Sequence, residues 1–245
     1  MQWVSLPPKI FQNVDRVSRN FLWGSSENKR KLHLISWKKI TITKKDRGLG
    51  LQAAKEKNVV LLAKLNWRFK KENDSFWAKV LSKKYCMHSR TPNHLLKSRT
   101  CSTTWAAMKK GADMFMEGSK WIAGKNGNLS FWFNKWLSRG TMRNLIEGPL
   151  NQGEDQLLRK DIVGFNGWNW HALSFIFKQL ALEIKATPLP FSSTCEDRIS
   201  WISSTNGDFD IKEAYKIACT EKLVSDHNLF HGSWVWKVLL LPKVQ

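Results

Sequence analysis

The acidic side chains are the first candidates for chemistry, because two-metal catalysis needs carboxylates that converge on the metal ions. No two aspartates are adjacent anywhere in the 245 residues. The acidic neighbours Glu154–Asp155 and Glu196–Asp197 fall in predicted loops, where we expect them to be solvated. Asp208 and Asp210 alternate beside a predicted turn, a pattern typical of surface polar positions. We therefore predict that the chain has no catalytic residues and is not an enzyme by itself.

Cysteine and histidine side chains are the next candidates, as ligands of a metal ion. Cys86, His88, His94 and Cys101 are residue types that suit tetrahedral zinc, but their spacing matches no common zinc finger. None of the four cysteines belongs to a Cys-x-x-Cys pair, so we interpret them as reduced thiols. The sequence also lacks a Gly-x-x-x-x-Gly-Lys phosphate loop. We predict neither a metal site nor a cofactor.

The lysine and arginine side chains remain, and their distribution is uneven. The formal net charge is +20 at pH 7, and residues 1–125 contain 27 Lys and Arg against 8 Asp and Glu, an excess of 19. The other 120 residues contain 13 against 12. Such an asymmetry indicates a polyanionic partner, whose bound counterions are released on binding. The alternative is a solvated basic surface that serves only solubility. Interleaved Trp and Phe residues favour a nucleic acid over a membrane.

Two groups of cations are the candidate phosphate contacts. The densest run consists of Lys29, Arg30, Lys31, Lys38, Lys39, Lys44, Lys45 and Arg47. Lys64, Arg68 and Lys71 follow at helical spacing and predict one stripe that could track a nucleic-acid backbone. Trp37, Trp67 and Trp77 could stack on bases, but tryptophans on the apolar side of a helix, such as Trp67 and Trp77, belong more often to a core. We expect both in the core.

These side chains must be positioned by elements that the apolar periodicity predicts. Helical spacing recurs over residues 10–22, 52–71, 75–85 and 103–116, and further helices are expected at 169–184, 212–221 and 234–241. Turn signals at Lys125–Asn128 and Asn206–Gly207 predict two β-hairpins, over residues 121–133 and 199–211. The expected fold is α+β and mainly helical, with a basic helical N-terminal half followed by a smaller half of two β-hairpins and helices.

Many short segments together carry a resemblance to one family. They are Leu6–Ile10, Phe21–Gly24, His33–Trp37, Gly48–Leu51, Asn58–Leu65 with Trp67–Arg68, Trp77–Leu81, Lys84–Tyr85, Gly124–Gly127, Phe131–Trp132, Trp136–Leu137, Trp201, Gly207, Ala214–Tyr215, Trp236–Lys237 and Leu241–Val244. In this order and spacing the chain resembles, over essentially its whole length, the region after the polymerase palm in plant LINE-type (non-LTR) retrotransposon reverse transcriptases. That group includes degenerate copies called ribonuclease H-like proteins.

The resemblance implies a place within a larger protein. The catalytic aspartates would precede Met1, and a Cys/His zinc-binding module would take its ligands from beyond Gln245. Residues 1–117 would be the basic helical thumb and post-thumb region, 118–232 a mixed hairpin–helix region, and 233–245 the truncated start of the zinc-binding module. Arg47 replaces a family glycine and Asn134 stands near an expected aspartate, changes that fit a decaying copy.

The predicted function is that of a non-catalytic, nucleic-acid-binding fragment of a retrotransposon-derived reverse transcriptase. It would contact the RNA or DNA backbone and the remaining domains of a parent polymerase, with no membrane partner and a location in the nucleus. Two alternatives stay open at this point, an inert pseudogene-like remnant and a host-adopted interaction module.

Overall fold

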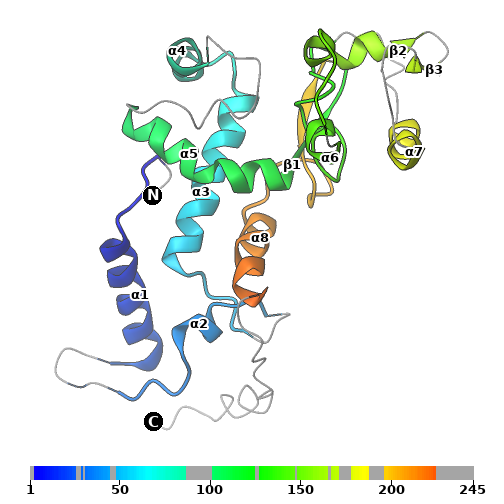
Figure 1. The fold of residues 1–245 in the computed structure, drawn as a ribbon. Coiled ribbons are helices and arrows are strands. Elements are labelled where there is room, and N and C mark those ends of the chain that lie inside the picture. The colour runs from blue at the N-terminus through cyan, green and yellow to red at the C-terminus, as the bar shows by residue number, and fades with distance from the viewer. Residues whose placement is uncertain are drawn as a thin grey trace.

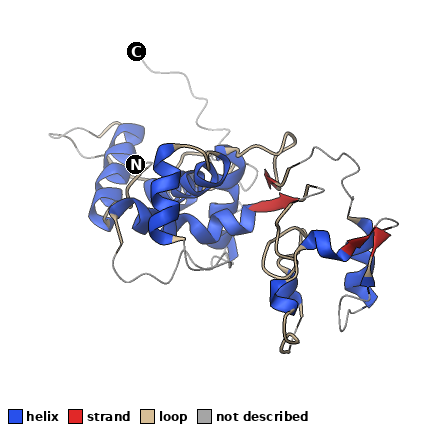
Figure 2. Ribbon diagram, turned by 90° about the horizontal axis from the view of Figure 1, so that it is seen from above, coloured by secondary structure: helices blue, strands red, loops and turns tan. Residues whose placement is uncertain are grey.

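The computed structural model describes residues 3–25, 29, 31–44, 48–86, 101–124, 127–146, 148–164, 167–170, 178–187 and 196–224. The predicted loop at 87–100 and the predicted helix at 234–241 lie outside these ranges. Helices α1 to α5 and α8 lie together in one part of the molecule, and the remaining short elements form a second part beside it (Figure 1). Seen from above, strand β1 lies where the two parts meet (Figure 2).

Four of the five N-terminal helices match predicted ones closely, and the short α2 had not been predicted. They are α1 (Pro8–Trp23), the short α2 (Trp37–Ile40), α3 (Ala54–Lys71), α4 (Phe76–Tyr85) and α5 (Thr103–Gly118). Gly24 ends α1 with a φ of 64°, a left-handed conformation that glycine adopts without steric cost. The Ser102 hydroxyl caps α5 by accepting the N–H of Trp105 at 3.3 Å.

Helix α3 is the centre of this part, and α5 crosses it at close range (Figure 1). A Cβ atom at Gly111 of α5 would lie 2.4 Å from the carbonyl carbon of Leu62 in α3, so only glycine allows this approach. The buried amide of Asn66 joins the two helices by donating to the carbonyl oxygens of Leu62, at 3.0 Å, and Met108, at 2.8 Å. These two bonds satisfy the buried NH2 group of Asn66, as most buried polar groups require.

Two apolar clusters hold the other helices to α3. The first joins α3, α4 and α5 through Leu65, Phe69, Ala78, Trp105 and Met108. The second joins α3 and α5 to α8 (Ile211–Val224) and to strand β4 (Arg198–Trp201), and its members include Val60, Trp67, Phe115, Trp201 and Tyr215. Segments near residues 200–219 therefore complete the core of the N-terminal part. The division of the chain at residue 118 stays a prediction.

The strands pair differently from the predicted hairpins. Strand β1 (Ser119–Ile122) pairs antiparallel with β4, with Ser119 opposite Trp201 and Ile122 opposite Arg198. The first strands expected of the two hairpins thus pair with each other, and the two hairpin predictions were wrong. A second pair, β2 (Val163–Gly164) with β3 (Gly167–Trp168), had not been predicted. The prediction of a mainly helical α+β fold is confirmed.

Burial explains why residues 129–133 do not form the expected hairpin strand. Phe131 and Trp132 are consecutive and are 0% and 1% exposed, whereas alternate residues of a strand point to opposite faces. The chain instead turns here, and the Trp136 indole N–H donates to the Phe131 carbonyl at 2.9 Å. Residues 208–210 likewise form no strand. The Trp201 N–H bonds to the Gly207 carbonyl, and α8 begins at Ile211.

A third apolar cluster forms the core of the second part of the molecule. Its buried members are Phe131, Trp132, Trp136, Leu137, Met142, Ile146, Ile162, Leu180 and Ile184. They come from a turn, from α6 (Met142–Leu145), from a 3-10 helix at Arg159–Ile162 and from α7 (Lys178–Ala186). The aromatic side chains of Phe131, Trp132 and Trp136, expected near a hairpin, thus belong to this core. Within the described ranges, no helix has the length and apolarity needed to cross a membrane.

Candidate nucleic-acid interface

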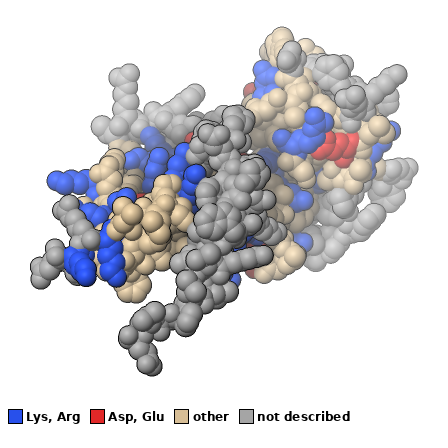
Figure 3. Space-filling view, turned by 90° about the horizontal axis from the view of Figure 1, so that it is seen from below, with Lys and Arg blue, Asp and Glu red and all other residues tan. Residues whose placement is uncertain are grey.

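The predicted basic run lies along the segment from the end of α1 to the turn after α2. Lys29, Lys31, Lys38 and Lys44 are exposed and Lys39 is half-buried. The remaining three members, Arg30, Lys45 and Arg47, lie outside the described residues. Seen from below, Lys and Arg side chains gather over the N-terminal helical part of the molecule, at the left of the view (Figure 3). A phosphate backbone could reach this surface without any rearrangement of buried groups.

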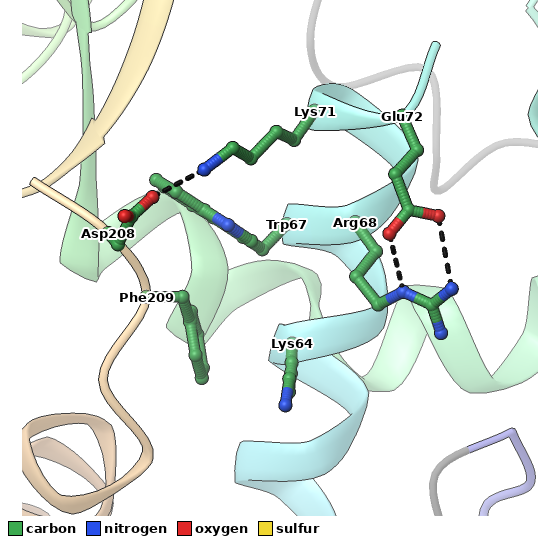
Figure 4. A pocket seen from close by; sticks show the side chains of 7 residues that line it. All are labelled: Lys64, Trp67, Arg68, Lys71, Glu72, Asp208 and Phe209. Atoms are coloured by element: carbon green, nitrogen blue, oxygen red, sulfur yellow. Dashed lines mark hydrogen bonds and ion pairs between the residues drawn. The ribbon is translucent and has the colours of Figure 1, made fainter. Parts of the chain in front are cut away.

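The predicted stripe on α3 opens onto one pocket of about 400 Å³. Lys64, Arg68 and Lys71 line it together with Trp67 and Glu72 of the same segment (Figure 4). Asp208 and Phe209, which immediately precede α8, complete its wall from the other side. Helical spacing predicted that the three cations share one face of α3. No pattern in the sequence indicated that Asp208 and Phe209, just before α8, would lie beside them.

Two of these three cations have carboxylate partners. Arg68 donates to Glu72 through Nε, at 2.8 Å to Oε1, and through Nη2, at 3.0 Å to Oε2. This hydrogen bonding raises the pKa of Arg68 and lowers the pKa of the Glu72 carboxyl. Lys71 pairs with Asp208. A phosphate group that entered the pocket would therefore compete with both carboxylates for its cations.

Lys64 differs from the other two cations, since no carboxylate among the described residues pairs with it. The pKa of Lys57, two turns earlier on α3, is lowered mainly by burial and also by the positive charge of Lys64. Two lysines in this arrangement repel each other, and an anion between them would relieve that repulsion. Lys57 is therefore a candidate contact that the sequence analysis did not select.

The aromatic residues around the pocket serve mainly as structure. Trp67 is 5% exposed and belongs to the core, as predicted. Trp77 is half-buried, and its indole N–H donates to Glu72 at 3.3 Å. The guanidinium of Arg68 lies over two rings, 5.3 Å from the centroid of Trp3 and 5.9 Å from that of Trp77. The sequence analysis missed Trp3, which is 41% exposed and contacts the Arg68 guanidinium.

The carboxylates that could have served catalysis have structural partners instead. Asp210 accepts the backbone N–H groups of Lys212, at 2.6 Å, and Glu213, at 3.1 Å, at the start of α8. The carboxylate of Asp197 accepts two backbone N–H groups, from Gly124 and Asn128. Within the described ranges, no three His, Cys, Asp or Glu side chains gather as a metal site.

The expectation that the two acidic neighbour pairs are solvated was wrong for one member of each. Glu154 is 8% exposed and accepts the N–H of Asn151 at 3.1 Å. Asp197 is half-buried. By accepting the N–H groups of Gly124 and Asn128, it joins these two residues to β4, which begins at the next residue. Short loops need such side-chain acceptors for their backbone N–H groups, and the sequence offers no periodicity that would reveal them.

A buried arginine in the second part of the molecule was also missed. Arg159 is 4% exposed, and its guanidinium lies 5.4 Å from the ring centroid of Trp136 and 5.1 Å from that of Trp168. Burial lowers its pKa, although the charge of Asp197 acts in the opposite direction. Its place between rings and next to a core makes it a structural cation rather than a phosphate contact.

Comparisons with known proteins give two relatives. Along its whole length the chain is 31% identical, over 249 residues, to "Putative ribonuclease H protein At1g65750" of Arabidopsis thaliana, and it spans 40% of the length of that relative. It is also 28% identical over 138 residues to "Uncharacterized mitochondrial protein AtMg00310" of Arabidopsis thaliana. The aligned part covers 56% of this chain and 89% of that relative. No protein-family model matches the chain, and no solved structure does.

Proposed function

We propose that this chain is a non-catalytic segment of a retroelement-derived, reverse-transcriptase-like protein and that it binds the phosphate backbone of RNA or DNA. The observation that carries the proposal is the excess of 19 positive charges within residues 1–125, with Lys29, Lys31, Lys38 and Lys44 exposed on that part of the molecule. A surface of this kind binds polyanions through counterion release and with little sequence preference.

The comparisons and the resemblance support the retroelement origin in different ways. The full-length relative carries ribonuclease H in its name, and this chain corresponds to 40% of it. The order of short motifs along the chain is similar to the region after the palm in LINE-type reverse transcriptases. In such a protein, this segment would hold template or primer–template while other domains perform the chemistry. A nuclear location follows from the same proposal.

The pocket on α3 suggests how binding would depend on conditions. Its three cations face two carboxylates, so the pocket carries one net positive charge and binds an anion only weakly by itself. The exposed lysines of the 29–44 segment would therefore provide most of the affinity. Both sets act through long-range, screened attraction, which falls steeply with salt.

A salt titration tests the proposal directly. Purified protein is titrated against a labelled RNA stem–loop and a DNA duplex, and the logarithm of the affinity is plotted against the logarithm of the salt concentration. We expect a linear decrease with a slope of several units, and a loss of about two units of slope in the double variant Lys38→Gln/Lys44→Gln, since each phosphate contact contributes ~0.9 on B-DNA. Lys160→Gln/Lys185→Gln, which removes two exposed charges from the second part, is the matched control.

The outcomes separate the proposal from its alternatives. Equal losses in the two double variants would show that the charge of the whole chain, and not the N-terminal surface, determines binding. Absence of binding by a folded sample would favour the inert remnant. Cleavage of an RNA–DNA hybrid in the presence of Mg²⁺ would contradict the non-catalytic role. This reaction is the one to test, because the relative that aligns along the whole chain has ribonuclease H in its name.

A further inference from the structure

Among the described residues, helix α4 packs against the rest of the molecule through one face. Ala78 is 1% exposed and Leu81 packs against the same cluster. The ring of Tyr85 stacks on Trp105 with centroids 4.5 Å apart and an interplanar angle of 13°. Trp77 contacts Phe69, with centroids 5.8 Å apart. Because four residues spread over the whole helix anchor it, the orientation of its outer face is fixed.

The outer face of α4 combines an exposed aromatic ring with lysines. Phe76 is 84% exposed and Val80, one turn later, is 47% exposed. Lys79 and Lys83 are exposed and follow Phe76 by three and seven residues, so they lie on the same side of the helix. Lys79 has a partner in Asp74 at 3.5 Å, but the Asp74 side chain is 95% exposed, and a pair in that environment is weak.

This combination of side chains fits one kind of ligand better than others. An apolar protein partner would favour more apolar area than one ring and one valine, and the flanking lysines would lose their hydration on docking. A nucleotide is complementary to both parts of this face. Its flat base can stack on the ring, and its phosphate can contact the lysines. In a duplex the base faces are already covered by their neighbours, so only unpaired nucleotides can stack on a protein ring.

We propose that the outer face of α4 is a binding site for single-stranded nucleic acid, in which one base stacks on Phe76 and the flanking phosphates contact Lys79 and Lys83. The inference rests on the proposed function, and it adds a preference for unpaired nucleotides that the general basic surface does not provide. The ring stands on a rigid helix, so stacking requires no conformational change in the protein.

The test compares single-stranded and duplex ligands on the full 245-residue chain. A 20-nucleotide single-stranded RNA that carries one 2-aminopurine and a 20-base-pair duplex are titrated with wild type, Phe76→Ala, Phe76→Leu and Phe76→Trp. We expect Phe76→Ala and Phe76→Leu to lose about five- to a hundredfold in single-strand affinity, and Phe76→Trp to retain it. Duplex affinity and its salt slope should be unchanged, and 2-aminopurine fluorescence should be quenched by wild type and by Phe76→Trp.

Controls keep the two proposals separable. Leu182→Ala removes an exposed apolar side chain from α7, outside the proposed site, and should leave single-strand affinity within twofold of wild type. If Phe76→Ala binds both ligands as wild type does, the stacking site is wrong while the proposed function stands. If wild type binds neither ligand, both proposals fail. Retained affinity in Phe76→Leu, or equal losses for single strand and duplex, would also overturn stacking, since leucine keeps the apolar bulk but has no aromatic face.

Discussion

At the scale of single residues, Arg68 shows how this molecule treats its cations. Spacing predicted a phosphate contact, and the structure gives the same guanidinium a bidentate carboxylate partner and two aromatic neighbours. Glu72 thereby accepts from both Arg68 and Trp77. A cation held in this way is oriented before any ligand arrives, at the cost of a carboxylate that competes with the ligand.

The pH dependence of stability tests this pair. The folded-state pKa of Glu72 lies below its ordinary value, so the pair stabilises the fold at neutral pH, and its contribution disappears as the pH falls through that lowered pKa. We expect Glu72→Gln to reduce the free energy of unfolding by about 0.5 kcal/mol at pH 6, a small value because both side chains are more than a third exposed to solvent screening.

Urea denaturation of wild type and Glu72→Gln between pH 6 and pH 3 measures that difference. It should shrink steadily on acidification, because protonation of Glu72 removes its charge from the pair. Glu196→Gln, at an exposed position, is the control and should match wild type throughout. A difference that stays constant with pH would mean that the substitution acts through packing and not through the charge of Glu72.

At the scale of elements, α1 shows the difference between forming a helix and placing it. Its apolar spacing predicted a helix, but no residue of α1 is buried. Val17 is 65% exposed and Phe21 is 88% exposed. The helix is attached instead through Asp15, whose carboxylate accepts the N–H of Ala54 at the start of α3 at 3.0 Å. The amphipathic pattern therefore determined the secondary structure here but did not identify the face that contacts α3.

The crossing of α3 and α5 gives a prediction about packing. Gly111→Ala would improve helix propensity by about 0.8–1 kcal/mol. The added Cβ would, however, lie 2.4 Å from a backbone atom of Leu62, which cannot move independently of α3. Overpacking costs about 1–3 kcal/mol, and a clash with backbone atoms places this site in the upper half of that range, so we expect a net destabilisation of roughly 1–2 kcal/mol. Thermal and urea unfolding measure it, with Asp113→Ala at an exposed position of α5 as control. An unchanged or raised stability in Gly111→Ala would contradict the close approach.

At the scale of the whole molecule, residues far apart in sequence contact each other: α8, near the end of the described chain, packs against α3. The buried hydroxyl of Tyr215 in α8 accepts the N–H of Ala53, 162 residues earlier, at 2.8 Å. Burial is the main cause of the raised pKa of this phenol. Trp201 and Ala214 cover the same side of α3. The basic helical part thus depends on residues from the end of the described chain for its core.

The two tyrosines of the sequence allow a matched comparison of this long-range contact. Tyr215→Phe leaves the Ala53 N–H buried without a partner, which costs about 1–3 kcal/mol. Tyr85→Phe removes a bond of the same length, 2.8 Å to the Ser102 N–H, at a partly exposed site where water can replace it. We expect urea unfolding to show the larger loss of stability for Tyr215→Phe, and faster amide hydrogen exchange at Ala53. Equal losses in both variants would show that the long-range bond is no more buried than the local one.

The sequence by itself determined the longer N-terminal helices, because their apolar periodicity and their ends are local properties, and α3, α4 and α5 lie within two residues of the predicted bounds. It did not predict the short helices α2 and α6. It also determined the uneven charge and the shared face of Lys64, Arg68 and Lys71. Tertiary structure decided the rest. It paired β1 with β4, and it buried the consecutive side chains of Phe131 and Trp132 in a core instead of in a hairpin strand. It brought Asp208 and Phe209 to the pocket and turned Phe76 to the solvent. Such contacts depend on which surfaces meet across long stretches of chain, and no local pattern records that choice.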